Sequence, residues 1–249
     1  MITSIITANI ILIAVVSGVL LLYVRRKINF LVKHVSNTAS EISEFIWTAR
    51  TVDAHVEKSI RLPRPNPWTL DGAAIATLCE VIHENQPSFV VELGSGLSTP
   101  IIGAAIREYG GKLLSIDHDP SFAAVTRSYI TANGLQDRVE IRVAELKKVD
   151  SGSHALWYDK SLLADIDGID FLLIDGPPKA VHPMIRQHAL PFFFDKLSPA
   201  ATLLLDDTNR SGEAKIIDRW RTDYPVRSVK VRGFPKSHTV VEIQKARST

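Results

Sequence analysis

The sequence is poor in cysteine, with Cys79 as the single thiol among 249 residues. One cysteine cannot form an internal disulfide bond, so the chain is not a small secreted domain held together by disulfides. A lone thiol fits a reducing compartment such as the cytoplasm. Cys79 stands in the apolar helical stretch AAIATLCEVI, where we expect it to be a small core residue.

The sequence also has little net charge. Its 29 lysines and arginines almost balance 27 aspartates and glutamates, which leaves a formal charge of +2. Such a chain has no strong electrostatic attraction to nucleic acid, so no nucleic-acid partner is predicted. The length suits one large α/β domain with an N-terminal extension.

Charges are missing altogether from Ile2–Val24, which is mostly aliphatic. About 20 apolar residues are enough to cross a bilayer. The run lacks the preceding basic residues and the small-residue cleavage site of a signal peptide. Arg25, Arg26 and Lys27 follow it, and the positive-inside rule keeps that end in the cytoplasm. Residues 1–27 are therefore predicted to be a single-pass transmembrane anchor, with the rest of the chain facing the cytoplasm.

Glycine and proline are missing from Ile28 to Ile60. Apolar or small residues recur there in alternating steps of four and three, a heptad-like pattern interrupted by Asp53. Two interpretations stay open: a stalk that forms a parallel homodimer, or an amphipathic helix that lies on its own domain or on the membrane. Prolines in Arg61–Pro67 then end the helix. Residues 28–67 are predicted to be stalk and linker, and residues 68–249 the main domain. The positions of the pattern are Ile28, Val32, Val35, Ala39, Ile42, Ile46, Ala49, Val56 and Ile60.

Apolar strands alternate with helical stretches after Trp68. This alternation predicts an α/β, doubly wound, mostly parallel sheet covered by helices on both faces. A helix at Gly212–Tyr224 precedes two final strands, which are predicted to form an antiparallel hairpin. The predicted strands are Phe89–Leu93, Lys112–Asp117, Val139–Val143, Ile169–Asp175, Ala201–Asp206, Val226–Arg232 and Thr239–Gln244.

The stretch Val90–Pro100 (VVELGSGLSTP) carries the clearest motif. A buried strand runs to the acid Glu92, a glycine turn follows at Gly94–Gly96, and a helix begins near Ser98. Glycines allow a ligand to approach the backbone closely, and a helix start offers free N–H groups to an anion. A dinucleotide site would favour a third glycine, where this chain has Thr99.

Acid-x-Gly-x-Gly resembles the first motif of the class I S-adenosylmethionine-dependent methyltransferases. The resemblance covers Trp68 to the end and implies a seven-stranded Rossmann-like sheet with an antiparallel last strand. It places the glycine turn over the methionine part of the cofactor, Asp117 at the ribose and His118 at the adenine. Asp117 follows Gly94 at the spacing of a ribose-binding carboxylate, although it could instead cap the helix near Pro120. The implied cofactor contacts are Glu92, Gly94, Ser95, Gly96, Ser98, Thr99, Asp117, His118, Ala144 and Glu145.

Three acids end neighbouring strands: Asp175 in FLLIDGPP, and Asp206 with Asp207 in LLLDDTNR. They resemble the Mg²⁺ ligands of the catechol-type O-methyltransferases, an Asp and an Asp-Asn pair. Asp207 replaces the Asn, and Pro178 stands where that family has a lysine, with Lys179 one residue later. The acids could instead cap a helix and shape a turn, so Mg²⁺ binding by these three residues stays open.

Transfer of a methyl group to a hydroxyl requires that the hydroxyl lose its proton. The candidate bases are Asp175, Lys179 and His182, with His188 as a further candidate, in a basic and aromatic segment predicted to form the acceptor wall. Trp68 is a candidate cover for the cofactor. The leading hypothesis is a membrane-anchored methyltransferase that acts on oxygen of a small-molecule, sugar or lipid-linked acceptor. The alternatives are a nicotinamide-dependent oxidoreductase and a non-catalytic adaptor that dimerises through its stalk.

Overall fold

The computed structural model describes residues 2–55, 59–66, 68–149, 155–233 and 236–245. The chain divides into two compact units, Met1–Ile46 and Trp47–Thr249, whereas the sequence predicted the main boundary after residue 67. Pro67 of the predicted linker and Val56 of the heptad-like pattern lie outside the described residues.

A single helix, α1 (Ile2–His55), contains both the predicted anchor and most of the predicted stalk. The predicted pattern residues Ile28, Val32 and Val35 are exposed on it. Within the described part of the chain, no helix combines the length and the apolar character that crossing a membrane requires. The predicted transmembrane span Ile2–Val24 is therefore not supported by the structure and rests on the sequence alone.

The second unit is built on a seven-stranded sheet in the order β3-β2-β1-β6-β7-β9-β8. All of its strands run parallel except β9, which lies antiparallel between β7 and β8. This confirms the predicted Rossmann-like sheet and its antiparallel last strand. The strands are β1 (Phe89–Leu93), β2 (Lys112–Asp117), β3 (Val139–Val143), β6 (Ile169–Ile174), β7 (Leu197–Leu205), β8 (Val226–Arg232) and β9 (His238–Gln244).

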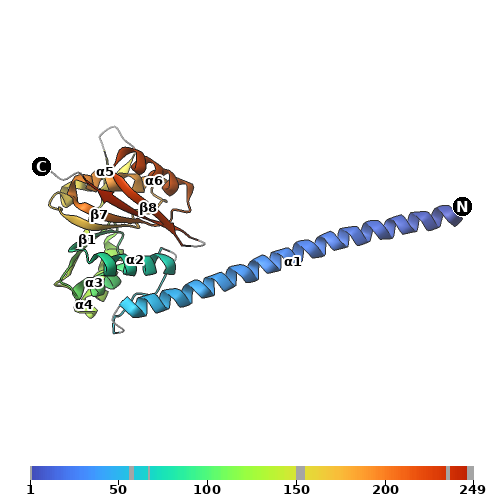
Figure 1. The fold of residues 1–249 in the computed structure, drawn as a ribbon, viewed down its shortest axis with the longest axis horizontal. Coiled ribbons are helices and arrows are strands. Elements are labelled where there is room, and N and C mark those ends of the chain that lie inside the picture. Colours follow the sequence, from blue (N-terminus) through green and yellow to red (C-terminus); the bar gives the residue numbers. More distant parts are fainter. Residues whose placement is uncertain (1, 56–58, 67, 150–154, 234–235, 246–249) are drawn as a thin grey trace. The chain divides into compact units, whose positions relative to one another are not determined.

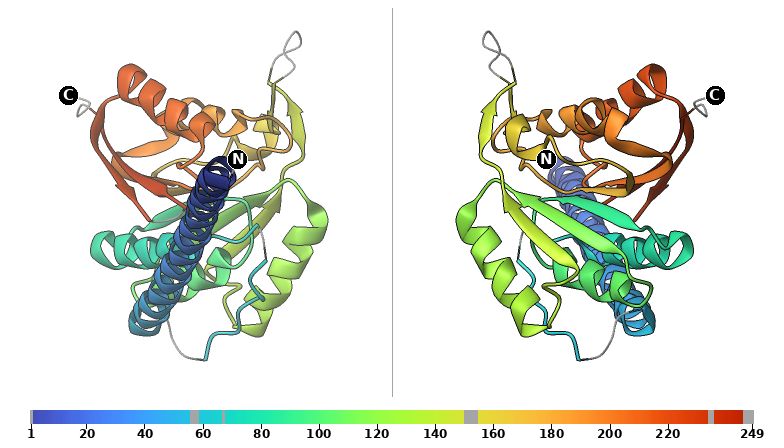
Figure 2. Two further views of the ribbon diagram at one scale, coloured as in Figure 1. Left: turned by 90° about the vertical axis from the view of Figure 1, so that its right-hand side faces the viewer. Right: turned by 90° about the vertical axis from the view of Figure 1, so that its left-hand side faces the viewer.

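Helices cover both faces of this sheet, with α2, α3 and α4 on one face and α5 and α6 on the other (Figures 1 and 2). Side chains of a strand alternate between faces: Val90 packs with the first group of helices and Val91 with the second. Because both faces are covered, the central strands β1 and β6 are apolar over most of their length. The helices are α2 (Gly72–Asn85), α3 (Ser98–Arg107), α4 (Pro120–Ala132), α5 (Ala189–Phe193) and α6 (Ser211–Asp223).

The structure contains elements that the sequence did not predict. A small antiparallel sheet pairs β4 (Leu146–Lys148) with β5 (Leu156–Tyr158), and short 3-10 helices occur at Lys160–Leu163, Ile185–His188 and Phe194–Lys196. β7 also begins at Leu197, four residues before the predicted start. The predicted acceptor wall is the segment PPKAVHPMIRQHALPFFF, residues 177–194. This prediction is wrong in its second half, because Leu190 and Phe193 are buried in the core beside α6.

Candidate active site

The glycine turn after β1 packs directly on the turn after β6. Gly94 has a φ of +96°, a conformation that glycine adopts without strain. A Cβ on Gly94 would lie 3.1 Å from the Gly176 nitrogen, and a Cβ on Gly176 would lie 2.7 Å from the Tyr158 hydroxyl. A Cβ on Gly96 would meet no atom within 4 Å. Gly94 and Gly176 thus hold two loops together, while Gly96 faces open space.

Glu92 lies fully buried beneath this turn. It accepts hydrogen bonds from the hydroxyls of Ser98 (2.5 Å), Thr99 (2.7 Å) and Ser115 (2.5 Å). Burial raises the pKa of Glu92 to about 7, although the hydroxyl donors lower it. Thr99 also accepts the Gly96 N–H at 2.9 Å, so the residue at the third glycine position ties the turn to Glu92. Glu92 organises the turn from below and does not line the cavity above it.

Asp117 ends β2 at the side of the glycine turn. One of its oxygens accepts the backbone N–H (2.9 Å) and the hydroxyl (2.6 Å) of Ser95, and the other accepts the Asp119 N–H at 2.9 Å. Burial alone would raise the pKa of Asp117, but hydrogen bonds from His118, Ser95 and Asp119 lower it. Asp117 is therefore ionised near neutral pH and held in one orientation, as binding of a ribose diol requires.

A cavity of about 270 Å³ opens over these groups. Its lining includes Gly94, Ser95, Asp117 and His118 together with the three acids Asp175, Asp206 and Asp207. A second cavity of about 500 Å³ shares Trp68, Gly94, Ser95, Phe122 and Asp175 with the first and adds Gly96 and Ser98. The predicted cofactor turn and the predicted acidic cluster therefore border one continuous hollow, large enough for a small ligand.

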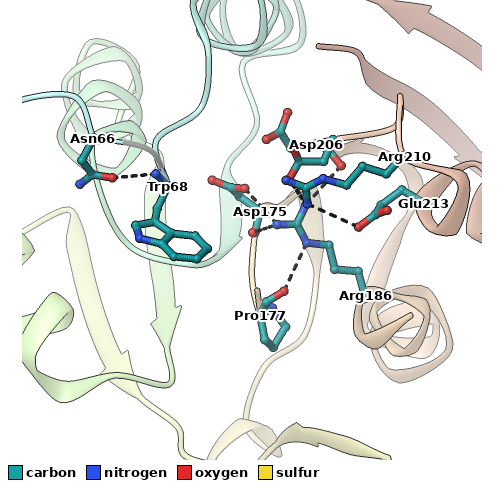
Figure 3. A network of polar contacts seen from close by, with 9 residues as sticks. Asn66, Trp68, Asp175, Pro177, Arg186, Asp206, Arg210 and Glu213 are labelled. Atoms are coloured by element: carbon teal, nitrogen blue, oxygen red, sulfur yellow. Dashed lines mark hydrogen bonds and ion pairs between the residues drawn. The ribbon is translucent and has the colours of Figure 1, made fainter. Parts of the chain in front are cut away.

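Trp68 stands at the edge of this hollow, across from the acidic cluster (Figure 3). Its backbone N–H donates to the Asn66 side chain at 2.8 Å, and the residue as a whole is 64% exposed. The preceding linker is fixed by Asn133, whose side chain bonds both the N–H and the carbonyl of Arg61. The linker residues thus take part in forming the site.

The three acids lie together, with one oxygen of each within 4.8 Å of the others. A buried arginine lies among them (Figure 3). Arg186 is only 4% exposed, and it pairs with Asp175 at 3.2 Å and with Asp207 at 3.3 Å. Arg210 adds a second ion pair to Asp207 at 2.6 Å. Two of the three carboxylates are thus neutralised by guanidinium groups.

Asp206 differs from its two neighbours. Its Oδ1 atom is buried without a hydrogen-bond partner among the described residues. The pKa of Asp206 is raised to about 8, chiefly by burial and in addition by the nearby charges of Asp175 and Asp207. Burial also raises the pKa of Asp175, although the Arg186 guanidinium lowers it. Asp206 has no ion pair among the described residues and is therefore the candidate of this cluster for proton transfer near neutral pH.

The cluster fits Mg²⁺ in donor type and spacing, since three carboxylate oxygens can converge on one ion. It does not fit Mg²⁺ in charge. An ion held by Asp175 and Asp207 would lie beside the Arg186 guanidinium, and a divalent and a single charge about 4 Å apart repel by roughly 8 kcal/mol at an effective dielectric of about 20. The guanidinium groups of Arg186 and Arg210 already supply the positive charge that the predicted metal ion would bring to these carboxylates.

The remaining predicted residues are placed as follows. Lys179 is exposed and lines the smaller cavity. His182 is exposed, accepts the Met184 N–H at 3.2 Å and does not line that cavity. His188 packs against Trp157. Ala144 donates its N–H to the Asp117 carbonyl at 2.8 Å, and neither Ala144 nor Glu145 lines the two cavities.

Sequence reasoning missed Arg186 and Tyr158. The hydroxyl of Tyr158 is buried without a partner among the described residues and stands beside Gly176. Arg186 had no clear signal, because the polar residues Gln187 and His188 follow it directly. Tyr158 had none, since it follows a segment of low hydrophobicity and lies in a strand of three residues.

Residues 91–208 match the family model described as a methyltransferase domain. Catechol O-methyltransferase of Mus musculus is 30% identical over 96 residues, which are 38% of this chain and 34% of that protein. The chain thus spans about a third of the length of the curated relatives that it matches.

Solved structures share the fold at low identity. A putative O-methyltransferase from Klebsiella pneumoniae has a TM-score of 0.55 at 15% identity, covering 80% of this chain and 90% of that one. The O-methyltransferase from Bacillus cereus in complex with SAH has a TM-score of 0.52 at 14% identity, again over 80% and 90%.

Residues 91–208 therefore match the methyltransferase class, and the main domain has the fold of solved O-methyltransferases. This match agrees with the predicted methyltransferase and its S-adenosylmethionine donor, whereas the predicted domain bounds 68–249 stay a prediction. Within this class, the sequence relative and the two solved structures named above are described as O-methyltransferases.

Substitution of Gly176 should affect the stability of the fold, whereas substitution of Gly96 should affect cofactor binding. Gly176→Ala should lower the free energy of unfolding by about 1–3 kcal/mol, because the new Cβ would meet Tyr158 and the Gly94 backbone. Gly96→Ala should leave thermal stability unchanged, since its Cβ meets nothing, but should weaken S-adenosylmethionine binding about tenfold, because the backbone can no longer approach the ligand closely. Thermal unfolding and calorimetric titration measure both effects. Equal losses of stability in the two variants would contradict this assignment.

Proposed function

We propose that this chain is an S-adenosylmethionine-dependent O-methyltransferase. The observation that carries the proposal is the continuous hollow in which Asp117 and the glycine turn face the acids that end β6 and β7. In open α/β sheets, ligands bind at the carboxyl ends of the strands. The arrangement thus offers a nucleoside site and, next to it, a site for proton removal.

Each group then has a defined task. S-adenosylmethionine, when bound, supplies an electrophilic methyl group. Asp117 accepts hydrogen bonds from the ribose hydroxyls, and the Gly94–Gly96 backbone borders the methionine part. The Asp206 carboxylate, a residue of the smaller cavity's lining, accepts the proton of the acceptor hydroxyl. The remaining lowering of the activation barrier comes from alignment of the acceptor oxygen with the methyl group, because two reactants bound in one site do not lose translational and rotational entropy in the reaction step.

The acceptor is proposed to be a small molecule, a sugar or a lipid-linked compound that presents a hydroxyl. Two features support this class. The hollow is bordered by the aromatic side chains of Trp68 and Phe122, which suit a ring or an acyl chain. Lys179 and Lys236 line the smaller cavity, which suits an acceptor that also carries a negative group.

Calorimetric titration tests the proposed cofactor. S-adenosylmethionine and S-adenosylhomocysteine should bind at about micromolar affinity, near −8 kcal/mol, and NAD(H) should not bind. Labelled S-adenosylmethionine incubated with acceptor extracts should then yield a labelled product. Binding of NAD(H) alone would favour the oxidoreductase alternative, and cofactor binding without any transfer would favour the adaptor.

We also propose that α1 attaches the enzyme to a membrane. The uncharged run Ile2–Val24 and the cluster Arg25–Lys27 support this proposal, and Leu20 and Leu21 are exposed on α1. The 249-residue chain should stay in the membrane fraction after carbonate washing, and protease added to intact cells should leave its main domain uncut. Release by carbonate would rule out a membrane span, and digestion from outside would show that the orientation is the reverse of the one proposed.

Pairing of two chains through residues 28–60 stays a prediction, which chemical cross-linking tests.

A further inference from the structure

Arg186 makes an unusual number of contacts for one buried side chain (Figure 3). Its Nε donates to the Pro177 carbonyl at 3.4 Å. Its Nη1 donates to the Asp206 carbonyl at 3.2 Å and to the Asp207 carboxylate at 3.3 Å. Its Nη2 donates to both the carbonyl and the carboxylate of Asp175. All three nitrogens of the guanidinium are therefore engaged at the ends of β6 and β7.

The position of this guanidinium decides the charge balance of the cluster. Three acids within 4.8 Å of one another would repel unless a cation lay among them. Arg186 is that cation, because it touches two of the acids with its side chain and the backbone of the third. Arg210, which is more exposed, adds positive charge to the cluster through ion pairs with Asp207 and Glu213.

We propose that Arg186 takes the place of a divalent metal ion in this site, so that the enzyme transfers methyl groups without one. The guanidinium holds the carboxylates of Asp175 and Asp207 in fixed orientations. It bonds Asp206 at the backbone carbonyl, which leaves the Asp206 carboxylate unpaired by Arg186 in the lining of the smaller cavity. Arg186 is thus a positioning residue for Asp206. Its planar guanidinium donates hydrogen bonds to groups at the ends of β6 and β7 at the same time. The compact ammonium of a lysine lacks this fixed set of donors.

A simpler role for Arg186 is to clamp the two strand ends for stability alone. Its bonds to the carbonyls of Asp175, Pro177 and Asp206 would serve that role equally well. Its bonds to two carboxylates go beyond it, because they compete with the atoms that a metal ion would use. The two roles differ in one measurable property, the binding of divalent ions once the guanidinium is removed.

Mn²⁺ alone is the probe for this test, followed by electron paramagnetic resonance on the 249-residue chain. The wild type should bind no Mn²⁺ at micromolar concentrations. Arg186→Gln frees Asp175 and Asp207 and should bind one Mn²⁺ at least tenfold more tightly than the wild type. Arg221→Gln, an exposed arginine of α6, is the matched control and should behave as the wild type. If Arg186→Gln binds no more Mn²⁺ than the control, Arg186 does not stand in for a metal.

A second measurement keeps the test decisive if Arg186→Gln does not fold. Wild-type methyl transfer should be unchanged in excess EDTA and should not increase with added Mg²⁺. Stoichiometric Mn²⁺ binding by the wild type, with activity lost in EDTA and restored by Mg²⁺, would overturn the proposal. The activity arm rests on the proposed function, whereas Mn²⁺ binding is measured without any transfer, so failure of one is distinguishable from failure of the other.

Discussion

Replacement of Asp117 by alanine is expected to weaken S-adenosylmethionine binding about 10- to 150-fold, or roughly 1.5–3 kcal/mol. Asp117 is buried and ionised, and Ser95 and Asp119 hold its two oxygens in place. Its loss removes charge-assisted hydrogen bonds to the ribose and leaves the Ser95 N–H without its acceptor. Calorimetric titration of the purified chain measures the change.

Two variants separate recognition of the ribose from general damage. Asp137→Ala removes an exposed carboxylate whose side chain is 68% accessible, and it should leave the affinity unchanged. Asp117→Asn keeps the shape but accepts with one atom only, so its affinity should fall between those of the wild type and Asp117→Ala. Unchanged binding by Asp117→Ala would show that Asp117 serves α4 and its cap, and that the cofactor lies elsewhere.

Much of the fold could be predicted because both faces of the sheet are covered. Strands such as Phe89–Leu93 and Lys112–Asp117 are then short, mostly apolar runs with an acid at or next to their last residue, and each end is visible in the sequence. Asp117 and the glycine turn were predictable for the same reason, since both follow directly from a strand end.

The partners of the acids were not predictable from local sequence. Arg186 reaches Asp207 across 21 residues of chain, and Arg210 bonds the same carboxylate from only three residues away. A short sequence window shows neither the burial of Arg186 nor the direction of its side chain. The pattern of acids alone therefore resembled a metal site, and only the three-dimensional arrangement shows that the compensating charge is already present.

Tyr158 and β5 could not be predicted for a different reason. β5 has three residues and, in the part of the chain that the structure describes, pairs with β4 alone, so no repeated alternation is long enough to reveal it. Its position depends on contacts of Trp157 and Tyr158 with the core of the main sheet. Such contacts between distant segments are a property of the folded chain.

Asp206→Asn is expected to lower kcat at least about 100-fold, the usual contribution of a general base, with little change in S-adenosylmethionine affinity. Asparagine keeps the shape of the side chain but cannot accept the proton of the acceptor hydroxyl. Steady-state kinetics with saturating cofactor, together with calorimetric titration, separate the two effects. A parallel loss of cofactor affinity would instead place Asp206 in the cofactor site.

The pH–rate profile gives an independent check on the same residue. Burial and the neighbouring acids raise the pKa of Asp206 to about 8, so its basic form is scarce below pH 8 and predominant above it. The wild-type kcat should therefore rise about tenfold per pH unit below pH 8 and become constant above it. Asp206→Asn should lose this rise, because the titrating group is gone. If the variant keeps both the rise and most of its activity, the base is another group of the hollow, with Lys179 or Asp175 as the nearest candidates. Arg186 forms an ion pair with the Asp175 carboxylate but bonds Asp206 only at its backbone carbonyl, and this geometric difference is why we assign the proton to Asp206.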